Sequence, residues 1–349
     1  MAYEVDYMPV GEGEKSGDAI VLRFGNLTGP REQQTVIVID GGYQESGELL
    51  VNHINEHYGT NEVNYVILTH PDIDHASGLC VVLEKMKVGA LIMHKPWEHA
   101  EDIKSLFQNG KITASGLQDK IEKSLQHASD LESMAQKKGI PIYEPFEGTY
   151  LDNVFHVLGP SKDYYQSLLP HFKDMPAPKI SLGAFAPIFR KAEEVANWIQ
   201  DHIGIDLLDD DNDTTSASNN TSAIIVFVID GHKLLFTGDA GKTALLNAIA
   251  YADSKGFSLT DLNFLDVPHH GSKRNLSSKI LKKIKATTAF ISAPTDSPKH
   301  PAKRVTNALR KHGHSVYVTR GKSILHHNQG NARGWGDIES EPFHDRFEE

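Results

Sequence analysis

The sequence predicts an α/β protein in which two β-sheets pack together and helices cover them on the outside. Short apolar runs typical of strands recur in both halves of the chain, and stretches with helical spacing separate them. No domain-sized linker divides the halves. The 349 residues would allow one large domain or two ordinary ones, and we expect a single domain over 1–349.

The first half alternates strands with helical stretches. The expected strands lie at 19–24, 35–40, 65–70, 89–94 and 154–160. A helix is expected from His75, after the third strand. Two helical insertions, at about 97–138 and 161–205, interrupt the pattern, and the latter part of the stretch 184–204 in the second is predicted to form an amphipathic helix. These insertions are natural docking surfaces for a protein partner or a second copy of the chain, although solvated decoration explains them equally well.

The second half begins with an acidic, low-complexity loop at about 207–220, which we expect to be flexible. Strand-like runs then follow at 223–230, 233–240, 262–268, 288–294 and 315–320, with helices between them. The halving of the chain into two such β-rich parts is what suggests two sheets.

Composition excludes several classes of protein. At 39% hydrophobic residues the chain can bury a sizeable core. The single cysteine, Cys80, excludes a disulfide framework and a cysteine zinc site. Apolar runs such as 223–229 are too short to cross a bilayer, and the first residues lack a secretion signal pattern. We therefore expect a cytoplasmic protein without membrane contact.

Charge is distributed unevenly along the chain. The formal net charge is −11, which argues against a protein coated in nucleic acid. The segment 269–323, however, holds nine lysines and four arginines against one acid, Asp296, and so carries +12, leaving −23 elsewhere. Lys273, Arg274 and Lys303 in this basic segment are candidate phosphate contacts. The alternative is that the lysines of its helix are a solvated face.

The stretch HPDIDH, at 70–75, carries the strongest chemical signal. An extended segment leaving the strand would point residues 70, 72 and 74 the same way, with His75 at the turn into the helix. Imidazole nitrogen and carboxylate oxygen are ligands for divalent metals, and clustering them without a cation is costly. The alternative is a polar surface turn.

Two later stretches make the surface turn a poorer explanation. The run KLLFTGDA ends an apolar strand with Gly238-Asp239, and LDVPHHGS ends another with His269 and His270. Three strand ends that each carry metal-type ligands predict one shared metal site.

These motifs together resemble the metallo-β-lactamase fold hydrolases, most closely the soluble nuclease domain of ComEC-type competence proteins. HPDIDH, TGDA and PHHGS stand in that family's order, with similar openings at 8–24 and 35–42 and a similar close at 288–301. The resemblance, spread over residues 3 to about 325, implies a four-layered αβ/βα sandwich that holds two divalent metal ions. It implies Mn²⁺ or Zn²⁺, with Mg²⁺ as a further alternative.

The resemblance also implies the ligands. It assigns His70 and Asp72 to the first ion, Asp74 and His75 to the second, Asp239 as the bridge, and one of His269 and His270 to complete the second. We expect His270 as that ligand and His269 as a proton donor or phosphate contact. Asp74 is expected to orient the attacking water, and His300, before Pro301, to line the substrate pocket.

The chain departs from the family pattern at two places. Asp72 stands where the family usually has histidine, and Asn219 and Asn220 stand where a further histidine usually precedes a strand. Oxygen in place of imidazole makes the first site harder and more favourable to Mn²⁺.

Three functions follow for comparison. The leading expectation is a phosphodiesterase, a nuclease that hydrolyses DNA through a water activated by two metal ions, in DNA uptake or antiphage defence. The second is a small-molecule hydrolase of the same fold, such as a lactonase, thioesterase or phosphocholine-type esterase. The third is a regulatory subunit without turnover. The basic segment favours the first, the overall negative charge the second, and the missing histidine the third.

Overall fold

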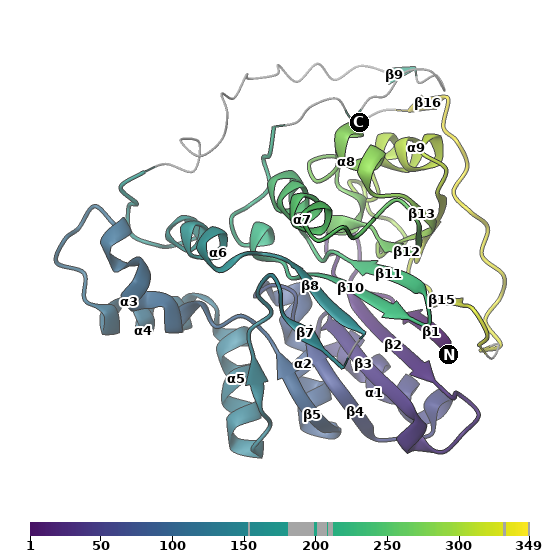
Figure 1. The fold of residues 1–349 in the computed structure, drawn as a ribbon, viewed down its shortest axis with the longest axis horizontal. Coiled ribbons are helices and arrows are strands. Elements are labelled where there is room, and N and C mark those ends of the chain that lie inside the picture. The colour runs from purple at the N-terminus through teal and green to yellow at the C-terminus, as the bar shows by residue number, and fades with distance from the viewer. Residues whose placement is uncertain (153, 181–198, 201–207, 209–211, 331–332, 348–349) are drawn as a thin grey trace.

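A computed structural model describes residues 1–152, 154–180, 199–200, 208, 212–330 and 333–347. In this part of the chain, two seven-stranded sheets lie face to face, and helices cover the outer face of each (Figure 1). The arrangement is the four-layered sandwich that the sequence predicts.

The first sheet is built mainly from the first half of the chain. Its strands are β1 (Ala2–Tyr7), β2 (Ala19–Gly25), β3 (Gln34–Gly41), β4 (Glu62–Ile67), β5 (Lys87–Ile92), β6 (Ile142–Tyr143) and β15 (Ile324–His327), in the order β15-β1-β2-β3-β4-β5-β6. The strands from β15 to β3 pair antiparallel, and those from β3 to β6 pair parallel.

The second sheet comes from the later part of the chain. Its strands are β7 (Tyr150–Leu151), β8 (Phe155–Gly159), β10 (Ile224–Ile229), β11 (His232–Phe236), β12 (Leu262–Asp266), β13 (Ala286–Ile291) and β14 (Ser315–Val318), in the order β14-β13-β12-β11-β10-β8-β7. The strands from β11 to β14 pair parallel. A separate pair joins β9 (Ile199–Gln200) to β16 (Arg346–Phe347).

The helices form the two outer layers. Beside the first sheet lie α1 (Gln44–Tyr58), α2 (Ile73–Lys85) and α5 (Gln126–Lys138), and beside the second lie α7 (Lys242–Ser254), α8 (Ser278–Lys283) and α9 (Lys303–Lys311). The remaining helices are α3 (Ala100–Ile103), α4 (Ala114–Ser124) and α6 (Lys162–Leu168). Short 3-10 turns occur at Arg31–Gln33, Pro96–His99, Lys104–Leu106, Leu169–His171, Asn219–Thr221 and Pro268–Gly271.

Three apolar cores hold the four layers together. Because side chains alternate across a strand, β3 sends Val36 and Val38 towards the helices, and Ile37 and Ile39 towards the other sheet. Strand β10 divides its residues in the same way. Strands buried on both faces read as continuous apolar runs, which is why both were recognisable in the sequence.

The structure corrects one local expectation. Helix α2 begins at Ile73, so Asp74 and His75 already lie in its first turn, and the extended run ends at Asp72. His326, which follows the family-like stretches in the sequence, lies in β15, and its Nε2 is 3.2 Å from the hydroxyl of Tyr3 on the neighbouring strand β1. Of the stretch 184–204, whose latter part is predicted to be helical, only residues 199–200 are described, and those form β9. The rest lies outside the described residues, as do 207 and 209–211 of the acidic loop.

The layers bring several strand ends to one edge of the sandwich. His70, Asp239 and His269 each stand three residues beyond the last residue of β4, β11 and β12, respectively. Among the helices of the described residues, none is long and apolar enough to span a membrane.

Candidate metal centre

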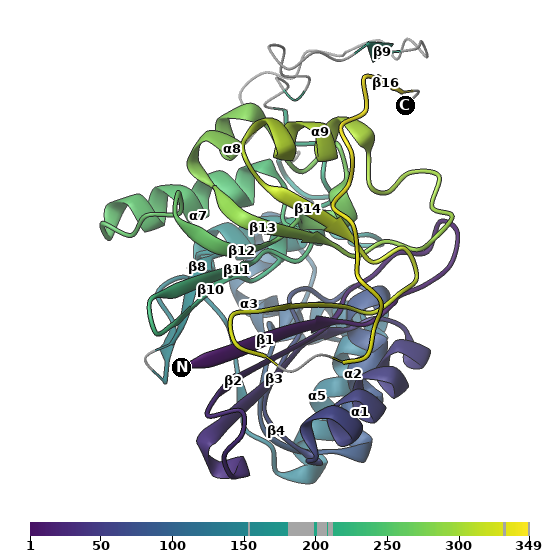
Figure 2. The ribbon, with the colours of Figure 1, turned by 90° about the vertical axis from the view of Figure 1, so that its right-hand side faces the viewer.

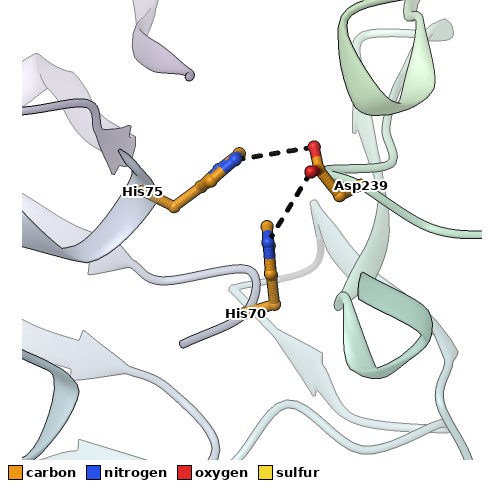
Figure 3. Close-up of side chains that lie close together, drawn as sticks. All are labelled: His70, His75 and Asp239. Carbon is orange, nitrogen blue, oxygen red and sulfur yellow. Dashed lines mark ion pairs between the residues drawn. The ribbon is translucent and has the colours of Figure 1, made fainter. Parts of the chain in front are cut away.

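The structure brings all six predicted metal ligands to one place between the two sheets. Figure 3 shows His70 and His75 pointing at Asp239 from the opposite side of the sandwich. The ligand atoms of His70, His75 and Asp239 lie within 4.8 Å of one another, and so do those of Asp74, His75 and His270. The chemistry of the six side chains therefore converges, although their role as ligands stays a prediction.

The Asp239 carboxylate stands at the middle of four imidazoles. Its Oδ2 lies 3.8 Å from Nε2 of His70 and 3.6 Å from Nε2 of His269. Its Oδ1 lies 3.5 Å from Nε2 of His75 and 3.6 Å from Nε2 of His270. Each oxygen of one buried carboxylate thus faces its own pair of histidines, which is the arrangement that a bridging ligand needs.

Hydrogen bonds behind two of these rings fix their tautomers. Asp40 accepts from Nδ1 of His75 at 2.7 Å, which leaves the lone pair of that imidazole on Nε2. The Thr69 hydroxyl donates to Asp40 at 2.6 Å, so at 3.1 Å it can only accept from Nδ1 of His70. Both Nε2 atoms therefore present lone pairs to the centre, as metal-bound histidines do.

A third carboxylate, Asp18, supports the other side of the centre. Its Oδ1 lies 3.6 Å from Nδ1 of His270, whose Nε2 points to Asp239. Asp72, the residue before α2, accepts a hydrogen bond from the Ser218 hydroxyl and lies 3.7 Å from Nε2 of His70. Asp18 and Asp40 were not predicted as site residues. Asp40, at the end of β3 before Gly41-Gly42, had the same strand-end signal as Asp239.

The electrostatics of the centre favour a cation. Burial alone would raise the pKa of Asp239, but the surrounding imidazoles, His269 foremost, hold that pKa well below its usual range. Burial alone would lower the pKa of His75, but the carboxylates of Asp239 and Asp40 raise it well above its usual range. In the described part of the chain, no lysine or arginine forms an ion pair with Asp18, Asp40 or Asp239.

The residues present fit a divalent metal. Among the buried atoms of the described residues that have no hydrogen-bond partner, four face the centre: Nε2 of His70, His75 and His270, and Oδ1 of Asp239. Unpartnered buried polar atoms are costly, and a cation would satisfy all of them at once. Imidazole with carboxylate suits Zn²⁺ and Mn²⁺.

The turn that carries the two adjacent histidines is locally strained. His269 and His270 have φ angles of 51° and 56°, in the left-handed region that side chains other than glycine seldom adopt. Each such residue costs of order 1–3 kcal/mol, and such strain clusters at functional sites. In this conformation the planes of the two imidazole rings make an angle of 75°.

A basic cavity opens next to this turn. It has a volume of about 690 Å³, and its lining includes His269 and the four predicted substrate-binding residues, Lys273, Arg274, His300 and Lys303. The His300 ring stacks on His269 with centroids 5.7 Å apart. Burial, followed by the neighbouring His270, lowers the pKa of His300 to about 3.

Two other histidines of the predicted strands lie elsewhere. His94 is buried against Tyr165 and Phe146, and the His156 ring lies tilted against the ring of Tyr150. Neither contacts the residues around Asp239 in the described part of the chain.

Comparison with known proteins places the chain in a family. The model of the metallo-β-lactamase superfamily matches residues 31–294. A search of curated protein sequences found no match.

Among solved structures, the chain is similar to Igni18, a metallo hydrolase from the archaeon Ignicoccus hospitalis, at 11% identity and a TM-score of 0.44, covering 93% of this chain and 100% of that one. It is similar to a diphosphatase from the PhnP family at 12% identity and a TM-score of 0.38, covering 94% and 99%. A motif mutant of a metallo-β-lactamase from Cronobacter sakazakii matches at 10% and 0.31, covering 81% and 74%.

These structural likenesses are too remote to carry an argument about substrate. The superfamily model, in contrast, spans well over half of the chain and includes the HPDIDH and TGDA stretches and the two adjacent histidines. The protein belongs to the metallo-β-lactamase superfamily, whose members are metal-dependent hydrolases.

Proposed function

We propose that the protein is a phosphodiesterase that uses two divalent metal ions, and that its substrate is DNA. One observation carries the proposal: the four residues predicted from the sequence to bind substrate line a single basic cavity, and that cavity reaches His269 beside the metal centre. The resemblance of the motifs to ComEC-type nuclease domains supports the same substrate.

The cations of the cavity suit a phosphate backbone. Arg320 is paired with Glu341, and Lys299 with Glu14. Lys273, Arg274 and Lys303 are exposed and form no ion pair with a described residue. These three side chains are therefore available to neutralise phosphates next to the centre.

The residues of the centre have distinct tasks in this proposal. Two bound ions would lower the pKa of a shared water and stabilise the charge on the scissile phosphate. Asp239 would hold both ions, and the hydrogen bond to Asp40 would keep the ring of His75 oriented. Asp74, in the first turn of α2, would accept the proton of the attacking water.

The test compares DNA with a small phosphodiester. The purified protein is incubated with plasmid, linear or single-stranded DNA, or with bis-p-nitrophenyl phosphate, in Mn²⁺, Mg²⁺ or Zn²⁺. The variant K273A/R274A/K303A should bind DNA more weakly, and the slope of log K against log salt should flatten by about one unit for each true contact. Its loss of rate on the small ester should be much smaller than its loss on DNA.

A matched variant controls for net charge. Lys279, Lys282 and Lys285 belong to the same basic segment and are exposed, but they do not line the cavity. Replacing these three with alanine removes the same charge and should change the slope little. If the two triple variants weaken DNA binding equally and change its salt dependence equally, general surface charge, and not the cavity, binds the DNA. Hydrolysis of the small ester without any cleavage of DNA would favour the small-molecule hydrolase, and absence of both activities the regulatory subunit.

A further inference from the structure

The first metal site has one ligand fewer than the second in the expectation drawn from the sequence. The second ion has Asp74, His75, His270 and a share of Asp239. The first has His70, Asp72 and the other share of Asp239, because asparagine replaces the family histidine at 219 and 220. The structure indicates which residue supplies the missing fourth ligand of the first ion.

Asn219 does not take the place of the missing ligand. Its Nδ2 donates to Oδ2 of Asp239 at 3.0 Å, and its Oδ1 accepts from the hydroxyl of Ser216. The side-chain oxygen, which is the only atom of an amide that binds a metal well, is therefore occupied by Ser216 and directed away from Asp239. Asn219 positions the bridging carboxylate instead.

His269 has the geometry of a ligand at this position. Its Nε2 lies 3.6 Å from Oδ2 of Asp239, the same oxygen that faces His70 at 3.8 Å. Two ligand atoms on one tetrahedral metal at bonds of about 2.0–2.2 Å stand roughly 3.4 Å apart, close to these separations. His270, one residue later, faces the other oxygen, Oδ1.

The tautomer of His269 is also that of a ligand. Its Nδ1 lies 3.0 Å from Oδ1 of Asn275. The amide nitrogen of Asn275 donates to the backbone carbonyls of Asp239 and Ala240 at 3.0 and 3.1 Å, so its Oδ1 must be the acceptor towards His269. Nδ1 of His269 therefore carries the hydrogen, and the lone pair lies on Nε2. The Nδ2 of Asn219 also approaches Nδ1, but only to 3.5 Å.

We infer that His269 is a ligand of the first metal ion and replaces the histidine that is missing before β10. The two adjacent histidines then divide between the two ions, His269 with His70, Asp72 and Asp239, and His270 with Asp74, His75 and Asp239. The left-handed backbone of both residues produces this division, since it turns their rings towards different oxygens of Asp239.

Two consequences follow for the centre. The nitrogen of His269 makes the first site less hard than its Asp72 suggests, so it would hold Zn²⁺ as well as Mn²⁺. The His269 side chain is 27% exposed and lines the basic cavity, which places the first ion on the substrate side. The inference rests on the two-ion centre of the proposed function, and not on its substrate.

Counting ions in double variants tests the assignment. Zn²⁺ per chain is measured by mass spectrometry after dialysis, and Mn²⁺ binding by calorimetry. His269→Gln should hold one ion, and His269→Gln with His70→Gln should still hold one, because both changes affect the same site. His269→Gln with His270→Gln should hold none. His300→Gln, a neighbouring histidine that does not face Asp239, should keep two.

The outcomes separate the possible failures. If wild type binds two ions and His269→Gln also binds two, His269 is no ligand. If His269→Gln with His270→Gln retains one ion, both histidines serve the same site and the division is wrong. A wild type that binds fewer than two ions would instead overturn the two-ion centre itself.

A variant that keeps every proposed ligand tests the inference in case the ligand variants fail to fold. Asn275→Leu removes the acceptor of His269 together with the two donors to the backbone carbonyls of Asp239 and Ala240, so Asn275→Asp, which lacks those donors but keeps an acceptor for His269, is its control. Loss of the acceptor behind a metal-bound histidine typically weakens metal binding about 10–100-fold. The first ion should weaken by this factor while the second keeps its affinity. Circular dichroism of each metal-free variant monitors the fold, and an unchanged first affinity in folded Asn275→Leu would contradict the inference.

Discussion

The protein buries two groups of carboxylates, and it compensates their charge in different ways. The arginine cluster consists of Glu4, Asp6, Arg23 and Arg333 and lies on β1. Its two carboxylates are fully buried, Arg23 reaches Glu4 at 2.6 Å, and Arg333 reaches both acids, at 2.6 and 3.0 Å. The second group, the carboxylates of the metal centre, has imidazoles around it but no guanidinium or ammonium ion pair within the described residues.

This difference suggests a structural role for the arginine cluster and a chemical role for the metal centre. Burying an ion is costly unless a partner compensates it, and the arginine cluster supplies permanent positive charge from within the chain. Within the described residues, the carboxylates of the metal centre pair with imidazoles, whose charge depends on protonation, and not with a permanent cation. The first cluster therefore balances its buried charge from within the chain, whereas the second is suited to balance its charge with a bound cation.

The arginine cluster also connects the segment 333–347 to the first sheet. The segment 333–347 returns along the side of the molecule from β15 towards α9 (Figure 2). Arg333 joins the beginning of this segment to β1, and hydrogen bonds between His344 and Asn307 join its later part to α9. Glu341, which pairs with Arg320, lines the basic cavity from this segment.

The largest expected effect comes from breaking the metal centre at its bridge. Asp239→Asn removes the anionic ligand shared by both ions and should abolish turnover and reduce the metal content below two ions per chain. The melting temperature without metal should fall little, because no arginine or lysine loses an ion pair. Metal content and rate on bis-p-nitrophenyl phosphate measure the effect. A fully active variant with two ions would rule out the bridge.

The next effect is on stability and comes from breaking the arginine cluster. Arg333→Met leaves the buried Asp6 and Glu4 with less compensation, and removal of one partner from a buried pair costs about 3–5 kcal/mol. The free energy of unfolding in urea should fall by this amount, while the number of bound ions stays the same. Loss of metal without loss of stability would mean that the two clusters are not separate.

The arginine cluster predicts a pH dependence as well. Burial alone would raise the pKa of Asp6, but His53 and Arg333 lower it below its usual value. Its contribution to stability is therefore complete above the unfolded pKa of about 3.9 and is lost as the pH falls through the lower folded pKa. Unfolding free energies measured down to about pH 3 should show a smaller acid loss in Arg333→Met than in wild type.

The two clusters differ in how far the sequence could predict them. The predicted ligands at 70, 239 and 270 each follow an apolar strand. Asp239 and His270 follow β11 and β12, neighbouring parallel strands of the second sheet, and the packing of the two sheets brings His70, after β4 of the first sheet, to the same edge. The arginine cluster has no such local pattern. Arg333 meets Glu4 across more than 300 positions of the chain, and only the fold makes them neighbours.

Within the candidate metal centre, sequence reasoning reached the residues that surround Asp239 and missed those behind them. Asp40 accepts a hydrogen bond from a ring nitrogen of His75, and Asp18 lies 3.6 Å from a ring nitrogen of His270, so their place in the centre depends on distances that residue spacing does not contain. The pairing of His269 with the first site is of the same kind. It depends on the backbone angles of a turn, whereas the letters HHGS are compatible with either assignment.

The smallest predicted effect is on metal affinity and comes from changing Asp40, which lies behind His75 in the metal centre. Asp40→Asn keeps the size of the side chain but removes the charge that accepts from Nδ1 of His75 at 2.7 Å and from the Thr69 hydroxyl. Because the ligands themselves stay in place, affinity for the second ion should fall about 10–100-fold, the usual cost of losing a partner of a metal-bound histidine.

Asp40 and Asp6 are both buried, so the same Asp→Asn substitution can be compared in the two clusters. It tests whether each carboxylate orients a metal ligand or balances a buried positive charge. Asp40→Asn should weaken binding of the second ion in a Mn²⁺ titration and weaken binding of the first ion by less, because Asp40 reaches His70 only through the Thr69 hydroxyl. Asp6→Asn should lower stability and leave both affinities unchanged. If Asp40→Asn instead lowered stability as much as Asp6→Asn and left metal affinity unchanged, Asp40 would belong with the structural carboxylates.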